Sequence, residues 1–205
     1  MVEKKYELVK DDVKEWCGKT LFRIRALKDF SVFKKGVFGG YVESEKNLTQ
    51  EGNAWVSNNA RVSGDACVSG NAWVSNNARV SGDACVSGNA WVSNNARVLG
   101  NAWVSGNARV SGNAWVSGNA RVSGNARVSG NAWVSGNARV SDNARVSGNA
   151  SVSGNARVSG DAWVYDARVS GHVKIDFILR SKFNFKSQEQ LDKWLELEKQ
   201  FLEVI

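Results

Sequence analysis

The chain has 205 residues and a net charge of +7, with 20 Gly, nine Trp, three Cys, one His and no Pro. No apolar stretch reaches the roughly 18 residues of a membrane-spanning helix, and the first ten residues are rich in charge, so we expect neither a membrane span nor a signal peptide. Three Cys without such a signal favour a reducing cytoplasm over a disulfide scaffold. A single His excludes sites that need two histidines of one chain, and the sequence has no Cys-x-x-Cys, P-loop or dinucleotide-binding motif, so we expect no metal and no cofactor.

The first part of the chain, residues 1–51, has no repeat, and we expect it to form a small β-rich cap. Residues 21–26 read as one of its strands, the pair Gly39-Gly40 reads as a turn, and Cys17 is expected in its core. A repetitive β-structure needs such a cap because its end otherwise exposes unpaired strand edges and the apolar core.

Residues 52–170 repeat a six-residue pattern, G-N-A-W-V-S or G-N-A-R-V-S with small variations. Val recurs every six residues from Val56 to Val164, and Ala keeps the same period two places earlier. A period of six is not helical but is compatible with strands, whose side chains alternate. W-V-S or R-V-S therefore reads as a short strand and S-G-N or S-N-N as a turn, which predicts a β-solenoid. The register breaks once, over residues 164–169, where one residue is missing.

The pattern V-S-G-N-A-W resembles the hexapeptide repeat of left-handed parallel β-helices, which place an aliphatic residue inward and a small residue four positions later, as Val56 with Ala60 do. The resemblance implies an all-β, left-handed parallel β-helix with three hexads per turn and about six to seven turns. Residues 29–48, followed by E-G-N-A-W-V, resemble the entry segment of uncharacterised bacterial and phage hexapeptide-repeat proteins, some of which are labelled acyltransferases on fold alone. Because that family frequently forms trimers, the resemblance also implies a homo-oligomer, a trimer or a dimer.

The last part of the chain, residues 171–205, departs from the repeat. Residues 172–179 read as a strand, and Ser187 with Gln190 is typical of the capping box that begins a helix. Apolar residues at helical spacing then form one stripe: Leu191, Trp194, Leu195, Phe201 and Leu202. We interpret this segment either as a cap on the last coil or as an oligomerisation helix.

If each turn holds 18 residues, residues 18 apart lie above one another at a spacing of about 4.8 Å. The residue before each Val points outward and carries most of the variation, so like residues fall into vertical blocks. The Arg blocks are Arg61, Arg79 and Arg97; Arg109, Arg127 and Arg145; and Arg121, Arg139 and Arg157. The outward Trp are Trp55, Trp73, Trp91, Trp103, Trp115, Trp133 and Trp163.

These blocks predict binding surfaces. Residues 52–170 hold ten Arg and five Asp but no Lys or Glu, and stacked like charges repel one another. Because Arg suits phosphate and carboxylate, the Arg blocks are candidate anion-binding sites, and the Trp columns are candidate stacking or interface surfaces. Trp91 above Arg109 allows a cation–π contact, and so does Trp103 above Arg121. The simpler alternative is that the blocks only record duplication of hexads.

Two further columns have structural interpretations. Cys67 and Cys85 are 18 residues apart, within disulfide range, and we expect two reduced thiols beneath Trp103. The Asn residues at the corners, from Asn53 to Asn155, predict ladders of hydrogen-bonded amides.

Taken together, the sequence favours a non-catalytic, self-associating binding protein whose ladders cover a protein partner or an anionic ligand. One alternative is a sponge for a nucleotide signal, held by Trp stacking and Arg; long nucleic acid is not expected, because the charge is spread over three faces. Another alternative is an acyltransferase based on His172, although no loop interrupts the hexads to build a pocket. Ice binding is disfavoured because Trp and Arg interrupt the regular Ser arrays.

Overall fold

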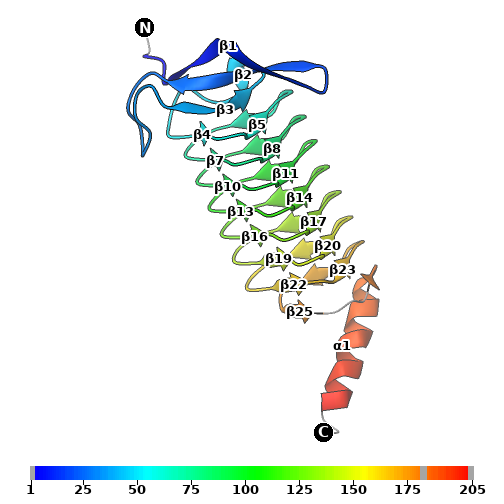
Figure 1. Cartoon of the computed structure of the whole chain (residues 1–205). Helices are drawn as coiled ribbons and strands as arrows, with labels where there is room; N and C mark the ends of the chain where they lie inside the picture. The colour runs from blue at the N-terminus through cyan, green and yellow to red at the C-terminus, as the bar shows by residue number, and fades with distance from the viewer. Residues whose placement is uncertain (1–2, 181–183, 203–205) are drawn as a thin grey trace.

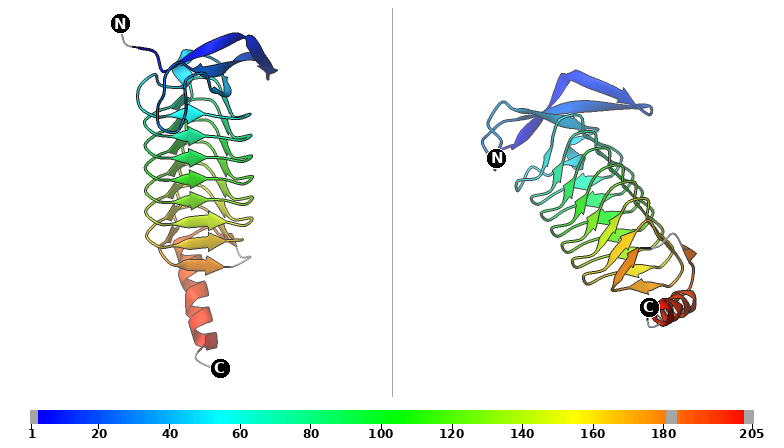
Figure 2. Two further views of the ribbon diagram at one scale, coloured as in Figure 1. Left: turned by 60° about the vertical axis from the view of Figure 1, so that its left-hand side comes forward. Right: turned by 60° about the horizontal axis from the view of Figure 1, so that its bottom comes forward.

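The computed structural model shows a long parallel β-solenoid with an antiparallel hairpin at its N-terminal end and one helix beyond its C-terminal end (Figures 1 and 2). The structure describes residues 3–180 and 184–202. Three sheets form the three faces of the coil, and we number these faces in the order in which the repeats enter them. No helix within the described ranges is long and apolar enough to cross a membrane.

The first face contains β4 (Trp55–Val56), β7 (Trp73–Val74), β10 (Trp91–Val92), β13 (Arg109–Val110), β16 (Arg127–Val128), β19 (Arg145–Ser147), β22 (Trp163–Tyr165) and β25 (Ile178–Arg180). The second contains β1 (Tyr6–Trp16), β2 (Lys19–Ala26), β3 (Phe38–Val42), β5 (Arg61–Val62), β8 (Arg79–Val80), β11 (Arg97–Val98), β14 (Trp115–Val116), β17 (Trp133–Val134), β20 (Ser151–Val152), β23 (Arg168–Val169) and β26 (Asn184–Phe185). The third contains β6 (Cys67–Val68), β9 (Cys85–Val86), β12 (Trp103–Val104), β15 (Arg121–Val122), β18 (Arg139–Val140), β21 (Arg157–Val158) and β24 (Lys174–Ile175). A 3-10 turn, η1 (Glu45–Asn47), lies in the cap, and α1 (Gln188–Leu202) ends the described chain.

The core follows directly from the repeat. Every repeat Val between Val56 and Val164, and every Ala two places before it, is at most 1% exposed, whereas the residue before Val points outward. Burial of these apolar side chains drives the coiling, because a two-residue strand has little stability of its own. Parallel stacking continues past residue 170 through β24, β25 and β26, which gives about eight turns rather than the expected six to seven.

Amide ladders run along all three corners, as the sequence predicted. In each ladder the Nδ2 group of one Asn donates to the Oδ1 atom of the Asn 18 residues later, at 3.0–3.4 Å. The ladders end on Asp161, Asp166 and His172, which lie 3.0, 3.3 and 3.1 Å from the last amide nitrogen. Each terminal side chain needs only to accept a hydrogen bond, and a carboxylate or a neutral imidazole nitrogen can do so.

The backbone hydrogen bonds of the coil have one direction, because the N–H groups of each turn donate to the carbonyls of the next. The N-terminal edge of the coil is therefore a row of carbonyls that need donors from the cap. Buried Asn47 supplies two, because its Nδ2 group donates to Gly64 O at 2.9 Å and to Ala66 O at 2.8 Å. Buried Lys5 supplies another, from Nζ to Ala54 O at 3.0 Å. The cap thus replaces the missing preceding turn.

The cap confirms one expectation and corrects two. Strand β2 contains the predicted strand over 21–26. Cys17 is exposed rather than buried, because it forms the β1–β2 turn with Gly18 and both have positive φ, 50° and 72°. Gly39 and Gly40 lie within β3 rather than in a turn. A Cβ at Gly39 would lie 2.6 Å from the carbonyl oxygen of Val56, so Gly permits this close approach of strand and coil.

The missing residue of the last repeat shortens one turn of the coil. Partner residues are 17 apart instead of 18 where Ser151 lies opposite Arg168 and Arg157 opposite Lys174. The last pairs are closer still in sequence, with Trp163 opposite Ile178 and Arg168 opposite Asn184. Asp166, with φ of 53°, forms the corner that Gly and Asn share elsewhere, and its Oδ1 atom accepts a hydrogen bond from Asn149 N at 2.7 Å. One residue therefore makes the turn and ends the amide ladder.

The beginning of α1 caps the other end of the coil. Ser187 Oγ accepts a hydrogen bond from Gln190 N at 3.3 Å, which confirms the predicted helix start. The last turn leaves N–H groups without a following turn, and Gln188 Oε1 accepts from Lys174 N at 2.9 Å while Gln190 Oε1 accepts from Lys186 N at 2.9 Å. The first helical turn thus acts as a cap, whereas the C-terminal part of α1 extends beyond the solenoid in Figure 1 and in the left view of Figure 2.

Candidate functional site

The predicted ladders exist in register on the three faces. On the first face, Arg109 lies opposite Arg127, and Arg127 lies opposite Arg145, in adjacent parallel strands. On the third face, Arg121, Arg139 and Arg157 pair in the same way. We call these sets the first-face Arg ladder and the third-face Arg ladder. Their rigid spacing is that of neighbouring strands, about 4.8 Å.

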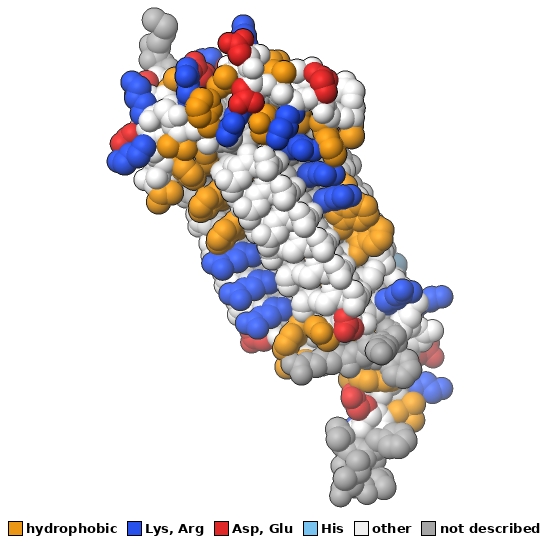
Figure 3. Space-filling view, viewed as in Figure 1, with side chains coloured by type: hydrophobic (Ala, Val, Ile, Leu, Met, Phe, Trp, Pro, Cys, Tyr) orange, Lys and Arg blue, Asp and Glu red, His pale blue; other side chains and the backbone are white. Residues whose placement is uncertain are grey.

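The first-face Arg ladder lies exposed and without a neutralising charge. All three side chains are exposed, and none forms an ion pair with any residue that the structure describes. Figure 3 shows Lys and Arg side chains gathered as a block over strands β13, β16 and β19, below a block of hydrophobic side chains. Trp91 lies one rung above this ladder and Trp163 one rung below it. The ladder is therefore a cationic strip between two aromatic side chains.

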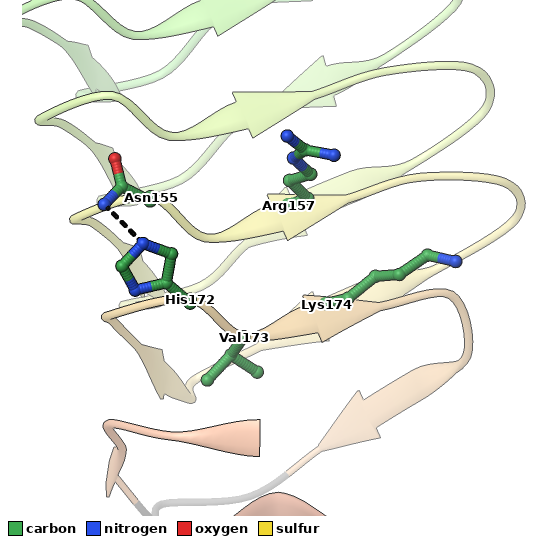
Figure 4. Close-up of a pocket in the computed structure, with 5 residues that line it drawn as sticks. All are labelled: Asn155, Arg157, His172, Val173 and Lys174. Atoms are coloured by element: carbon green, nitrogen blue, oxygen red, sulfur yellow. Dashed lines mark hydrogen bonds between the residues drawn. The ribbon is translucent and has the colours of Figure 1, made fainter.

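The third-face Arg ladder gains a fourth cation that the sequence did not predict, because Lys174 lies opposite Arg157. Arg157 and Lys174 extend from adjacent rungs beside a shallow hollow of about 420 Å³, with His172 and Asn155 at the neighbouring corner (Figure 4). The imidazole of His172 is the last member of an amide ladder, since its Nε2 atom lies 3.1 Å from Asn155 Nδ2. Its position in the fold is thus explained by the ladder.

The second-face Arg block, Arg61, Arg79 and Arg97, is not an open surface. The hairpin of β1 and β2 places Trp16 against it, with the guanidinium carbons of Arg61 and Arg79 4.1 and 4.3 Å from the ring centroid. Burial, and then the charges of Arg97 and Arg61, lower the pKa of Arg79. These three Arg are half-buried beside the cap, so they offer less to an external anion than the two exposed ladders. Trp16 carried no sequence signal for this role, because the contact depends on how the cap docks.

The Trp columns are less open than the sequence suggested. Trp55 is 1% exposed, because Tyr6, Phe30 and Phe33 of the cap pack on its ring at centroid distances of 5.1–6.3 Å. Of the seven outward Trp, those classed as exposed are Trp91, Trp103 and Trp133, at 38, 46 and 47%. Trp55 therefore belongs to the core between cap and coil, and the exposed aromatic surface is smaller than expected.

Most of these indoles are fixed by a Ser 16 residues earlier. Trp73, Trp91, Trp103 and Trp163 each donate Nε1–H to that Ser Oγ, at 2.8, 3.1, 3.3 and 2.7 Å. At Trp115 the equivalent position is Leu99, and the Trp115 Nε1 atom is buried without a hydrogen-bond partner in the structure. The Ser after each Val thus orients the Trp of the next turn, which the sequence pattern alone did not indicate.

Arg side chains cover the ring faces at the ends of the Trp blocks. The guanidinium carbon lies 5.6 Å from the ring centroid for Arg109 on Trp91 and 5.8 Å for Arg121 on Trp103, so both predicted cation–π contacts are present. Within the first-face column, Trp73 and Trp91 stack at 5.5 Å with an interplanar angle of 7°. On the first face, a planar ligand therefore meets a Trp91 ring that is already in contact with Arg109 and stacked on Trp73.

Cys67 and Cys85 lie opposite each other on the third face and are not bonded. Burial, and to a lesser degree the neighbouring Cys85, raises the pKa of the Cys67 thiol, which therefore stays protonated at neutral pH. Among the residues that the structure describes, no group of three His, Cys, Asp or Glu could hold a metal ion.

The predicted oligomerisation residues divide into two groups. Leu191 is fully buried, and Trp194 packs its ring on Phe185 of β26 at 5.5 Å, so this part of the stripe contacts the chain's own coil. Leu195 is also half-buried against the core. The side chains of Phe201 and Leu202 lie outside the described part of the chain.

Comparison with known proteins gives one family. A model described as the YdcK beta solenoid repeat matches residues 60–76, 78–94, 90–106, 102–118, 120–136, 138–153 and 150–166, together about half of the chain. No curated protein matches the chain. The matched model describes a repeat and names no ligand or activity, so a functional proposal has to rest on the surface of the coil.

Proposed function

We propose that this chain, which belongs to the YdcK beta solenoid repeat family, is a non-catalytic binding protein whose first-face Arg ladder contacts an acidic surface of a partner protein. The observation that carries this proposal is the set of three exposed, in-register and unpaired guanidinium groups at Arg109, Arg127 and Arg145. Arg is the residue best suited to planar, bidentate contacts with carboxylates.

The fold itself gives no reason for these charges. The inward Val and Ala are the same whether the outward residue is Arg, Trp, Cys or, at Ser151, a small hydroxyl. Adjacent like charges oppose folding. A rigid ladder would instead aid binding, because its groups are already held in position and lose little freedom when a partner docks.

A protein surface fits the ladder better than a nucleotide does. Nucleotide capture by stacking needs an open aromatic face, but Arg109 covers the ring of Trp91 next to the ladder. Carboxylates on neighbouring strands of a partner sheet would repeat at the same spacing of about 4.8 Å as the Arg rungs. In the catalytic alternative, His172 would have to act as the general base. It ends the amide ladder that contains Asn155 and lines a shallow hollow beside Arg157.

We extend the proposal to the compartment, which we expect to be the cytoplasm. Cys67 and Cys85 face each other on adjacent rungs and remain free thiols, which supports a reducing environment.

The test is binding of fluorescent poly-L-glutamate, an acidic polypeptide probe, to the full chain at low salt. The variant R109S/R127S/R145S should bind at least tenfold more weakly, because Ser occupies the same outward position at Ser151 without disturbing the coil. The matched control R121S/R139S/R157S removes the same charge from the third face and should retain most of the binding. Equal weakening by both variants, or none by the first, would overturn the proposal; stronger binding of ATP or polyuridylate than of polyglutamate would replace the protein partner with a nucleotide or nucleic acid.

A further inference from the structure

We propose that the third-face cationic ladder, Arg121, Arg139, Arg157 and Lys174, binds helix α1 of a second copy of this chain. This proposal is independent of the partner of the first-face ladder. It rests on two surfaces of opposite charge and similar spacing. Neither the three Arg of the one surface nor the acidic residues of the other form ion pairs with the described residues of their own chain. One surface is the ladder, and the other is an acidic stripe on α1.

The acidic stripe consists of Glu189, Asp192 and Glu196. Their spacing of three and then four residues places them on one face of the helix, with Lys193 at its border. All three side chains are exposed, and none forms an ion pair with a described residue. The stripe is thus as unpaired as the Arg ladder.

The direction of the stripe follows from the packing of the helix. Leu191 is buried, and Trp194 packs on Phe185, so the face that carries these two residues points toward the chain's own coil. At 100° per residue, the acidic stripe lies on the opposite side of the helix. The acidic stripe therefore faces away from the coil to which the helix is attached, and Figure 1 and the left view of Figure 2 show the C-terminal part of α1 extending beyond the last turn.

The spacing of the two charge rows agrees. A rise of 1.5 Å per residue puts Glu189 and Glu196 about 10.5 Å apart along the helix. Two strand spacings put Arg121 and Arg157 about 9.6 Å apart, and Lys174 adds one more rung. Three carboxylates can therefore lie along three or four cations without a change in either backbone.

The position of the third-face cationic ladder near the C-terminal end of the coil favours this face as the binding site for α1 and favours a twofold arrangement of the two copies. Lys174 lies in the last third-face strand, and the three Arg occupy the three preceding rungs. Helix α1 has 15 residues, about 22 Å, which is the height of roughly four turns. If two copies meet antiparallel at their C-terminal ends, each α1 lies along the last four turns of the other. On the first face, by contrast, the last two rungs carry Trp163 and Ile178 rather than cations.

The arrangement is self-complementary, because each copy supplies one helix and receives one. Such isologous pairing closes at two chains. The two exposed Arg ladders then have different roles: the third-face ladder joins two copies, and the first-face ladder remains open.

The test is a charge exchange measured by sedimentation velocity on the full chain. E189K/D192K/E196K should raise the dimer dissociation constant at least tenfold, and R121E/R139E/R157E should do the same. Mixed in equal amounts, the two variants should recover the dimer, because each pairs its altered surface with the oppositely charged surface of the other. The matched control R109E/R127E/R145E changes the same charge on the first face and should still dimerise.

Circular dichroism checks that each variant is folded. Because all the changed side chains are exposed, each variant should keep the spectrum of the original chain. A monomeric original chain at 100 µM would overturn the proposal, as would folded variants that still dimerise or a mixture that stays monomeric. The first-face control separates this outcome from the proposed function, since loss of polyglutamate binding and loss of dimerisation depend on different ladders.

Discussion

The cap contains a single side chain whose loss should open the N-terminal edge of the third face. Asn47 is fully buried, donates to Gly64 O and Ala66 O, and accepts a hydrogen bond from Ser44 N at 2.9 Å. Asn47→Ala leaves two carbonyls without donors, of which Ala66 O is the more deeply buried. Since an unsatisfied buried acceptor costs about 1–3 kcal/mol, we expect the local opening free energy to fall by about 2–4 kcal/mol.

The assay is amide hydrogen exchange, because a repeat array opens from its ends and a single global transition would average the effect. Exchange across residues 60–70 should quicken by at least tenfold, while exchange across 120–140 stays unchanged. Asn71→Ala is the matched control, since its amide bonds lie on the exposed corner ladder. Equal protection in the two variants would refute the account of the cap as a donor for the first turn.

Two further changes test the cap and the corners. Burial, and then the charge of Lys28, lower the pKa of Lys5 from 10.5 to about 8. Between these two pH values the unfolded chain binds more protons than the folded chain, so the free energy of unfolding should rise by about 2 kcal/mol from pH 7 to 10, relative to that of Lys5→Met. Urea titrations measure this free energy, and a fall over that pH range would contradict the account. Gly106→Ala should lower the unfolding temperature more than Gly160→Ala does, because both have positive φ but only the Cβ at Gly106 would lie 3.0 Å from Gly124 O; equal shifts would contradict the backbone clash.

The period of the repeat explains why the coil could be predicted. Val and Ala are the same in nearly every hexad, so no other register buries them all, and the pairing of residues 18 apart follows. The outward ladders and the cation–π contacts of Arg109 and Arg121 follow from that register without further information.

The cap was less predictable because its contacts join segments that are far apart in the sequence. Nothing near Trp16 indicates that it will lie against Arg61 and Arg79, and nothing near Phe33 indicates that it will cover Trp55. The pair Gly39-Gly40 predicts a turn, since turns are the common use of such pairs, whereas in the structure the absence of Cβ atoms lets β3 lie close to the first turn of the coil.

Within the site, the sequence predicted the surface charges but not the differences in exposure and length between the three Arg blocks. Sequence alone treated three Arg blocks as equivalent, whereas the cap partly covers one and Lys174 extends another. The missing residue of the last repeat hides Lys174 from an 18-residue alignment, because Lys174 is 17 residues after Arg157. A search that allowed one deletion would have found it.

The central claim is that the first-face Arg ladder opposes folding and is present for binding. The most direct measurement compares the unfolding temperature of Arg127→Ser with that of the original chain at 20 and 500 mM NaCl, with Arg127→Lys as the control that keeps the charge. Because Arg127 lies between Arg109 and Arg145, its neutral replacement should raise the unfolding temperature by about 1–3 °C at low salt. Screening should remove the difference at high salt. A lower unfolding temperature at both salt concentrations would show instead that the ladder stabilises the coil.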